Sequence, residues 1–391
     1  MHRSGRFLRS LGVAITITAG ASLALGGAIS AHGYDCRVVG HVYVNDNTAG
    51  TNTIAGFDRR ADGTLTPIAG SPFSAGGAGA GTIIGSQGAI QLAGGARFVI
   101  AVDAGSNQLS VLRIGANGAL KLVEGGPISS NGILPVSLAV HGDLVYVAND
   151  GNGAEGSNYT GLRLNGDGWL TPLAGSTVTL PADAGPGDVL FNDTGTRLVG
   201  TRVNTSQSDS FVVTANGTLT AAPGSPYNAQ AAGPFGSAFR PTNADQLFVS
   251  NAHAGAGNGT VSAFHDNWNG TLTPIGSSPY ADNQTAPCWV TITPNGQYLF
   301  TVNTASGSIS RYAIAESGVL TLLGSTPIKD ATGLRPFDIT VTPGGHFAYT
   351  VDAGHATVSA FTIGEHGSLT ELVSSPIALP AGATPFGIVA D

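Results

Sequence analysis

The feature that most constrains this chain is a seven-fold repeat of a Gly-x-Leu-Thr turn. Its leucines are Leu65, Leu120, Leu170, Leu219, Leu272, Leu320 and Leu369, which lie 55, 50, 49, 53, 48 and 49 residues apart. The second copy is degenerate and reads Gly118-Ala119-Leu120-Lys121. A regular spacing of this length indicates one supersecondary unit repeated along the chain, with neighbouring units burying each other's apolar faces.

Each repeat divides into four short segments with strand character, and the sixth repeat shows them well. Residues 288–293, 297–302, 308–314 and 319–323 are short runs with alternating apolar residues. Gly, Pro and Asn bound these runs, as in Pro294-Asn295-Gly296, which is typical of strands and tight turns. No window of comparable length has helical periodicity. Four antiparallel strands in each of seven repeats predict an all-β fold, the seven-bladed β-propeller.

The two ends of the chain complete one blade between them. The first recognisable strand, residues 41–46, matches the second strand of the repeat. The missing first strand is found at residues 385–390, which match residues 234–239 and 336–341. We therefore expect the C-terminal strand to join blade one and close the ring, which removes the exposed edges of an open array. This circular register disfavours a β-solenoid or a row of sandwiches, and no WD40 signature recurs.

The N-terminus has the pattern of a secretory signal peptide. Three arginines precede an apolar run from Leu11 to Leu25, and small residues up to Ala31 offer cleavage sites. The run is short for a membrane span of about 20 residues, so cleavage is favoured over an anchor. We expect a signal peptide at residues 1–31 and a single propeller domain at residues 32–391. The mature protein is then a secreted or periplasmic monomer without membrane contact.

Composition limits the surfaces that the protein can bind and the covalent link that it can form. The formal net charge is −8 and only 10% of residues are charged, which argues against a nucleic-acid or anionic-membrane surface. The 58 glycines follow no collagen period and indicate many tight turns. An exported chain can form a disulfide, so Cys36 and Cys288 either pair or remain two buried thiols.

Propeller topology predicts where a binding site lies. In a four-stranded meander, the start of the first strand and the loop after the second strand reach the same end of the central channel. Loops held by a rigid scaffold are the usual place for binding groups. The candidate substrate-binding residues there are Gln87, Asn149, Asp188, Trp289, Asp338 and Asp352. The competing interpretations are that the Asx side chains cap turns and that Trp289 packs between blades.

Four residues at this end are candidates for catalysis. His253 and His355 follow second strands, where a neutral imidazole can act as a base. Arg202 and Arg335 are two of few cations and can stabilise an oxyanion. The alternatives are solvent-exposed histidines and salt-bridged arginines. No zinc motif or nucleophile elbow is present, so we predict no metal site and no required cofactor; binding of a divalent cation by loop acids stays open.

The repeat resembles that of a known family. Residues 293–303 (TPNGQYLFTVN), and residues 358–361 (VSAF) followed by Gly367-Ser368-Leu369-Thr370, are similar to repeats of the lactonase-type seven-bladed propellers. That family includes bacterial 6-phosphogluconolactonase and the fungal carboxy-muconate lactonizing enzyme. Tyr43-Val44-Asn45-Asp46 resembles the Tyr-Val-Thr-Asn strand of surface and secreted propellers. The resemblance covers the chain from about residue 41 onward.

The resemblance implies a lactonase-type fold and leaves the catalytic residues open. Enzymes of the family typically begin one inner strand with Pro-His-x-His, whereas the equivalents in this chain read Gln87-Gly88, Pro135-Val136-Ser137 and Pro186-Gly187-Asp188. No catalytic residue is therefore assigned by motif. We predict a secreted hydrolase that opens an unphosphorylated sugar or organic-acid lactone at the channel mouth. The alternatives are a non-catalytic propeller that binds a carbohydrate, peptide or cell-envelope partner there, and isomerase or lyase chemistry.

Overall fold

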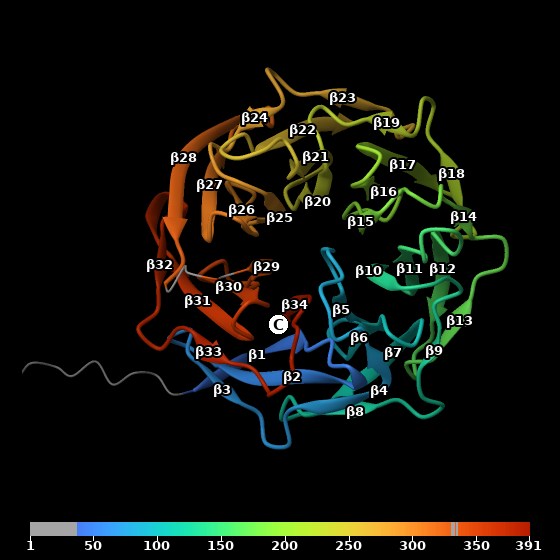
Figure 1. The fold of residues 1–391 in the computed structure, drawn as a ribbon, viewed down its shortest axis with the longest axis vertical. Helices are drawn as coiled ribbons and strands as arrows, with labels where there is room; N and C mark the ends of the chain where they lie inside the picture. The colour runs from blue at the N-terminus through green and yellow to red at the C-terminus, as the bar shows by residue number, and fades with distance from the viewer. Residues whose placement is uncertain (1–36, 330–332, 334) are drawn as a thin grey trace, which may run out of the picture. The chain divides into compact units, whose positions relative to one another are not determined.

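The computed structural model describes residues 37–329, 333 and 335–391, and these residues form the predicted all-β ring. They belong to one compact unit, Asp35–Asp391. Seven antiparallel sheets surround a central channel, with the first strand of each sheet innermost (Figure 1). The only helical element among the described residues is the 3₁₀ turn η1 (Glu365–Gly367). The predicted signal peptide and Cys36 lie outside the described residues.

The strands follow the meander expected from the repeat, in order from the innermost to the outermost strand of each blade. Blade 1 contains β34 (Ile388–Ala390), β1 (Val38–Asn45), β2 (Gly50–Arg60) and β3 (Leu65–Pro67); blade 2 contains β5 (Ile90–Ala93), β6 (Phe98–Asp103), β7 (Gln108–Ile114) and β8 (Leu120–Leu122); blade 3 contains β10 (Pro135–His141), β11 (Leu144–Asn149), β12 (Asn158–Leu164) and β13 (Leu170–Pro172). Blade 4 contains β15 (Pro186–Phe191), β16 (Arg197–Arg202), β17 (Gln207–Val213) and β18 (Leu219–Ala221); blade 5 contains β20 (Pro234–Arg240), β21 (Asn243–Asn251), β22 (Thr260–Asp266) and β23 (Leu272–Pro274). Blade 6 contains β25 (Pro287–Ile292), β26 (Tyr298–Asn303), β27 (Ser308–Ile314) and β28 (Leu320–Pro327); blade 7 contains β29 (Pro336–Val341), β30 (Phe347–Asp352), β31 (Thr357–Ile363) and β32 (Leu369–Glu371).

The ring closes as the sequence predicts, between the last strand and the first. β34 pairs antiparallel with β1, with Val42 opposite Ala390 and Val44 opposite Ile388. In Figure 1 this pairing brings the red end of the chain beside the blue beginning of the ring. Beyond the strand, Arg59 donates to the Asp391 carbonyl oxygen over 2.6 Å. The closure therefore combines backbone pairing with a charge-assisted hydrogen bond.

The repeated Gly-x-Leu-Thr turn joins each blade to its neighbour. Gly63 has φ +83°, and a Cβ there would lie 2.3 Å from the Phe347 ring of blade 7. Glycine is required because the position needs both a left-handed backbone and a close approach. The Gly63 carbonyl oxygen accepts a 2.8 Å hydrogen bond from the hydroxyl of Tyr349 in β30. The same tyrosine-to-glycine bond joins Tyr43 to Gly118 and Tyr146 to Gly217.

Six sheets contain a short fifth strand that the four-strand prediction missed. These strands pair with the third strand of their blade, beyond the end of the fourth, and are β4 (Phe73–Gly79), β9 (Ile128–Ser129), β14 (Val178–Thr179), β19 (Tyr227–Asn228), β24 (Tyr280–Ala281) and β33 (Ile377–Ala378). The recurring Ser-Pro lies at the break between the two outer strands. At that break, Ser71 accepts the backbone N–H of Gly56 over 2.9 Å, and Ser375 does the same for Ala360 over 3.1 Å. The serine therefore satisfies a strand N–H that the interrupted ladder leaves free.

Candidate functional site

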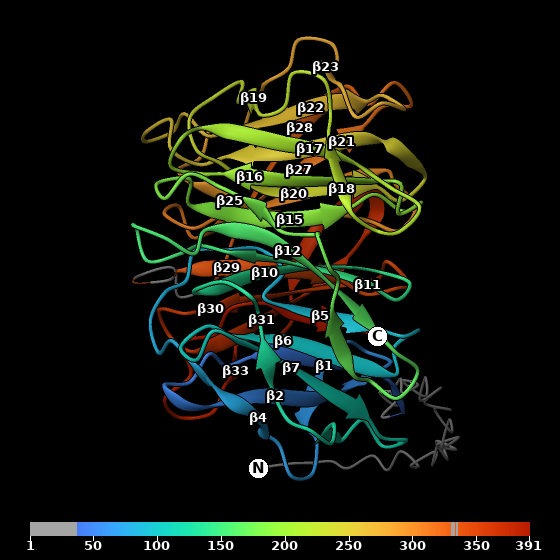
Figure 2. The same cartoon turned by 90° about the vertical axis from the view of Figure 1, so that its right-hand side faces the viewer.

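The channel has two ends of different construction. We call the end where the inner strands begin the mouth, and the opposite end, where first and second strands are joined by turns, the turn face. Figure 2 shows the loops and turns gathered at two opposite edges of the ring, with the strands running between them. The candidate residues from the sequence were all expected at the mouth.

The segment 84–89, which precedes β5, crosses the channel near the mouth. The Gln87 side chain donates to the Ser237 carbonyl oxygen over 2.7 Å and accepts the Val290 N–H over 2.9 Å. Its backbone N–H donates to the Gly187 carbonyl oxygen over 2.9 Å. The next residue, Gly88, donates to Oδ2 of Asp338 over 3.2 Å. Gln87 therefore links blades 4, 5 and 6 across the ring, while Gly88 links to blade 7.

Aromatic side chains close the channel around this segment. Trp289 is 1% exposed, and its ring centroid lies 5.1 Å from Phe235 and 4.7 Å from Phe337. The stack continues from Phe337 to Phe386 at 4.5 Å. The indole N–H donates to the Ser86 carbonyl oxygen over 2.7 Å. The structure thus places Trp289 in a packed, hydrogen-bonded interior position; ligand stacking by this residue stays a prediction.

Asp188 and Asp338 are buried side chains with protein partners. Asp188 accepts the N–H and the hydroxyl of Ser237 over 2.9 and 2.5 Å, and a third bond from Ser137 over 3.2 Å. Asp338 accepts the N–H of Gly88, and of Ile339 over 2.9 Å. Burial raises the pKa of each carboxyl to about 7, although these hydrogen bonds act in the opposite direction.

Below the crossing segment the channel opens to the turn face. A cavity of about 270 Å³ has Gln87, Gly88, Ser237 and Asp338 among its lining residues, together with residues from the ends of inner strands such as Phe239. Gln87 and Asp338, predicted at the mouth, therefore also line a cavity that opens at the opposite end of the channel, the turn face. Asn149 is buried at the end of β11, where its amide donates to Oδ1 of Asn158 over 2.9 Å.

Arg202 lies at the end of β16 in a buried ion pair. Its guanidinium donates to both carboxylate oxygens of Asp209 in β17, over 2.7 Å from Nε and 2.5 Å from Nη2. The Tyr159 hydroxyl of blade 3 also donates to Asp209, over 3.1 Å. The Arg202 and Asp209 side chains are 10% and 2% exposed. This bidentate ion pair occupies the arginine, and the Tyr159 hydrogen bond links it to blade 3. The ion pair is the salt-bridged alternative considered for Arg202; its partner Asp209 was not singled out from the sequence.

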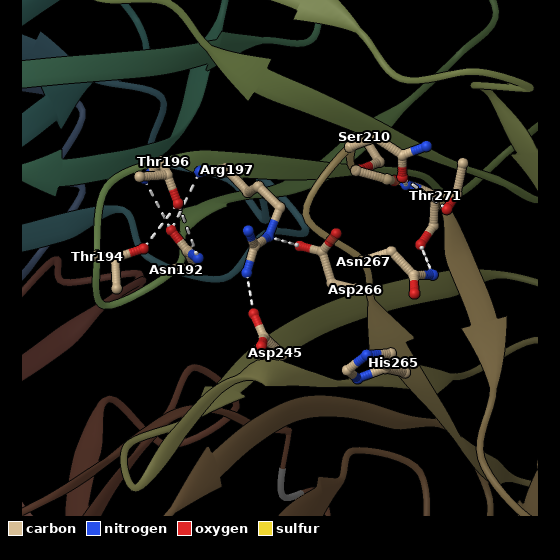
Figure 3. A network of polar contacts seen from close by, with 12 residues as sticks. Asn192, Thr194, Thr196, Arg197, Ser210, Asp245, His265, Asp266, Asn267 and Thr271 are labelled. Atoms are coloured by element: carbon tan, nitrogen blue, oxygen red, sulfur yellow. Dashed lines mark hydrogen bonds and ion pairs between the residues drawn. The ribbon is translucent and has the colours of Figure 1, made fainter.

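A second buried arginine links blades on the turn face. Arg197, at the start of β16, donates from Nε to Oδ2 of Asp266 over 3.0 Å and from Nη2 to Asp245 (Figure 3). Both carboxylates belong to blade 5. Burial raises the pKa of Asp266 to about 7 against the opposing effect of Arg197. The network stabilises the junction of blades 4 and 5, and His265 lies at its edge without a marked contact (Figure 3).

The mouth of blade 7 brings three predicted residues together. Nδ1 of His355 lies 3.1 Å from Oδ2 of Asp352, which ends β30 and is buried, whereas the His355 side chain is 42% exposed. The other carboxylate oxygen accepts the N–H of Arg335 over 2.7 Å and of Gly354 over 2.8 Å. Arg335 itself is exposed. The site therefore combines an accessible imidazole at ion-pair distance from a buried carboxylate with the backbone of Arg335 held by the same carboxylate, and a carboxylate beside a base is an arrangement that active sites use.

His253 lies on blade 5, separate from this group. It is exposed in the loop after β21, its N–H donates to the Ala232 carbonyl oxygen over 3.0 Å, and its ring lies over Gly233. The structure provides it with no carboxylate partner among the described residues. Of the two candidate histidines, only His355 lies beside a carboxylate among the described residues.

Three further features concern metal ions, membrane-spanning helices and the cysteine. No group of three or more His, Cys, Asp or Glu side chains within residues 37–329 and 335–391 is arranged to hold a metal ion. No helix there is long and apolar enough to cross a membrane. The Cys288 thiol is buried and free in the described structure, and burial raises its pKa to about 12.

Comparisons with known proteins agree with the architecture. Residues 232–388 match the family model described as "Lactonase, 7-bladed beta-propeller". The chain is similar to the structure of a putative 6-phosphogluconolactonase from Bacteroides uniformis (20% identity, TM-score 0.73, 91% of this chain and 100% of that one). A putative 6-phosphogluconolactonase from Bacteroides fragilis is similar at 19% identity and TM-score 0.72, covering 90% of this chain and 98% of that one.

The periplasmic gluconolactonase of Pseudomonas aeruginosa is similar at 16% identity and TM-score 0.69, with 90% of this chain and 98% of that chain covered. No curated protein sequence matches. These identities establish the fold, and the family model confirms the resemblance predicted from the repeat. The repeat and the ring make the chain a seven-bladed β-propeller, and its residues 232–388 are similar to the lactonase family of such propellers.

Proposed function

We propose that this propeller hydrolyses a lactone at its mouth, with His355 as the general base. The observation that carries the proposal is the 3.1 Å approach of His355 Nδ1 to the buried carboxylate of Asp352. A carboxylate at Nδ1 favours the tautomer that leaves Nε2 free to accept a proton. The same carboxylate accepts the backbone N–H of Arg335, which holds the backbone of the proposed cation beside the base. The lactonase family model and the gluconolactonase relatives support this class of reaction.

The proposed reaction needs no covalent intermediate. Nε2 of His355 takes a proton from water while the water oxygen bonds to the lactone carbonyl carbon. The carbonyl oxygen becomes a tetrahedral oxyanion, which the Arg335 guanidinium stabilises. The ring C–O bond then breaks, and the departing alkoxide receives the proton from the imidazolium. The product is the open hydroxy acid, and His355 returns to its neutral form.

The proposed substrate is an unphosphorylated sugar or organic-acid lactone. A phosphate requires several cations, and the mouth offers few of them. Arg202 is occupied by Asp209, and the chain has only two lysines. One of these, Lys329, donates to the Leu372 carbonyl oxygen over 2.6 Å, and the other, Lys121, lies in β8 at the outer edge of blade 2. An exported location, as the N-terminal sequence predicts, fits such a substrate; the periplasmic gluconolactonase relative supports it.

The test is hydrolysis by the purified mature protein, followed by pH-stat titration. Glucono-δ-lactone, galactono-γ-lactone and 6-phosphogluconolactone are compared, each corrected for its spontaneous rate. We expect kcat/KM for an unphosphorylated lactone to exceed that for the phosphorylated one by at least about tenfold. The proposal is contradicted if none of the three lactones is hydrolysed faster than in buffer, with or without added Ca²⁺ or Mg²⁺. The alternative of a non-catalytic binding protein would then remain. N-terminal sequencing of the exported protein tests cleavage near Ala31.

A further inference from the structure

Trp169 is an exposed aromatic residue at a position where the repeat does not need one. It occupies the variable position of the Gly-x-Leu-Thr turn in blade 3, where the other six copies carry Thr64, Ala119, Thr218, Thr271, Val319 and Ser368. Its side chain is 52% exposed. The turn is fixed, because the Trp169 N–H donates to Oδ1 of Asn165 over 2.9 Å. The fold tolerates small residues at this position, so the indole is not explained by the packing of the turn.

Two hollows adjoin this side chain on the outer edge of blades 2 and 3. One is a groove of about 670 Å³ between β8 and the turn that carries Trp169. The other is an apolar hollow of about 240 Å³ lined by Val123, Pro127 and Leu170. Trp169 lines both. Single exposed hydrophobic residues are common and need no explanation, but an indole between two hollows presents a surface that a ligand can cover.

Charged groups of both signs line the groove, and two of their side chains are free to bind a ligand. The side chains of Lys121 and Glu124 are exposed and form no hydrogen bond or ion pair with any described residue. Arg113 is held in place: its guanidinium lies 4.8 Å above the Phe98 ring and donates to the Asp167 carbonyl oxygen over 2.8 Å. Two cations and two acids, Glu124 and Asp167, give the groove no net charge. This pattern offers donors and acceptors without selecting an anion or a cation.

We propose that this groove is a saccharide-binding site in which Trp169 stacks on a sugar ring. A pyranose has an apolar C–H face that suits an indole and hydroxyl groups that both donate to carboxylates and accept from cations. The groove volume is within the range of small-molecule sites. A stable protein interface needs about 800 Å² from each partner, with an apolar centre, whereas the aromatic surface of the groove is a single side chain. The site is remote from the blade 7 mouth and independent of the proposed lactonase activity.

The test is isothermal titration calorimetry of the mature protein with cellohexaose, chitohexaose and maltohexaose. We expect at least one of the three to bind, and Trp169→Ala to weaken that binding about tenfold or more. Trp169→Phe retains most of the affinity. Glu124→Ala weakens binding about threefold. Thermal unfolding of each variant verifies that the fold is unchanged.

Trp268 provides the matched control. It is 85% exposed on the corresponding outer turn of blade 5 and lines neither hollow. Trp268→Ala is expected to bind as the unmodified protein does. Absence of binding to all three oligosaccharides overturns the proposal, and so does an equal loss in Trp268→Ala and Trp169→Ala.

Discussion

Blades 4 and 7 place a charged residue at the same point of the repeat, the last residue of the second strand, and use it differently. In blade 4, Arg202 pairs with Asp209 of the adjoining strand, and both side chains are buried. In blade 7, Asp352 is equally buried, but its partner His355 lies three residues on, in an exposed loop. A partner on the next strand gives a closed contact that stabilises the ring. A partner in the loop gives a contact with one side open to solvent, where chemistry can occur.

The largest expected effect is on stability, in blade 4. Arg202→Ala leaves the Asp209 carboxylate buried without its cation, which is expected to lower the free energy of unfolding by about 3–5 kcal/mol. Denaturant unfolding followed by circular dichroism measures this loss. The double variant Arg202→Met, Asp209→Leu removes both charges and is expected to regain about half of it. A single variant as stable as the unmodified protein would remove the distinction between the two blades.

The next effect is on rate, in blade 7. Arg335→Ala removes the cation proposed to stabilise the oxyanion, so kcat is expected to fall about 10²- to 10³-fold. The side chain is exposed, so the free energy of unfolding is expected to stay within about 0.5 kcal/mol of the original. Initial rates on the best lactone of the panel, with an unfolding curve of the same sample, give both quantities. A stability loss with unchanged kcat would assign Arg335 to structure.

The smallest expected effect is on the pH dependence of stability. It is distinct from any pH dependence of the reaction rate. Burial raises the pKa of Asp46 to about 7, as it does for Asp188, Asp266 and Asp338. An unfolded carboxyl titrates near pH 4, so the folded protein binds more protons between about pH 4 and 7. The free energy of unfolding therefore falls as the pH rises through this window.

Asp46→Asn tests this pH dependence of stability. Oδ1 of Asp46 is buried without a partner, and Oδ2 accepts the Thr53 hydroxyl over 2.7 Å. Asparagine keeps an acceptor for Thr53 and removes the buried charge. The loss of stability between pH 5 and pH 8 is expected to shrink by about 1–2 kcal/mol. Thermal unfolding across that range measures it, and stability that rises between pH 5 and pH 8 in the unmodified protein would refute the assignment.

The fold was predictable because its signals are local and repeated. The glycine of each Gly-x-Leu-Thr turn, such as Gly63, marks a left-handed turn whether or not its neighbour Phe347 is known. The matching first strands at residues 234–239 and 385–390 reveal the ring closure. The recurring Ser-Pro was visible too, but its meaning depends on a distant strand N–H, such as that of Gly56 for Ser71. The fifth strand was missed for that reason.

The site was predictable only as a set of residues at one end of the channel. Strand register places Asp352, His355 and Arg335 at the mouth, but not in contact with one another. Gln87 lies 150 residues from its acceptor at Ser237, so no local pattern shows that it spans the channel. Likewise, Asp209 shows no sign in the sequence that it occupies Arg202. These contacts depend on how loops of different blades meet, which the repeat does not encode.

The central claim is that catalysis depends on His355 of blade 7, the histidine beside the Asp352 carboxylate. The most direct test compares kcat/KM of the variants His355→Ala and His253→Ala on the same lactone. The two are a matched pair because both histidines are exposed at the mouth, whereas only His355 lies beside a carboxylate. The account predicts a 10²- to 10⁴-fold loss for His355→Ala, about the contribution of a general base, and a change below about threefold for His253→Ala. Equal rates in the two variants, or a larger loss in His253→Ala, would contradict it.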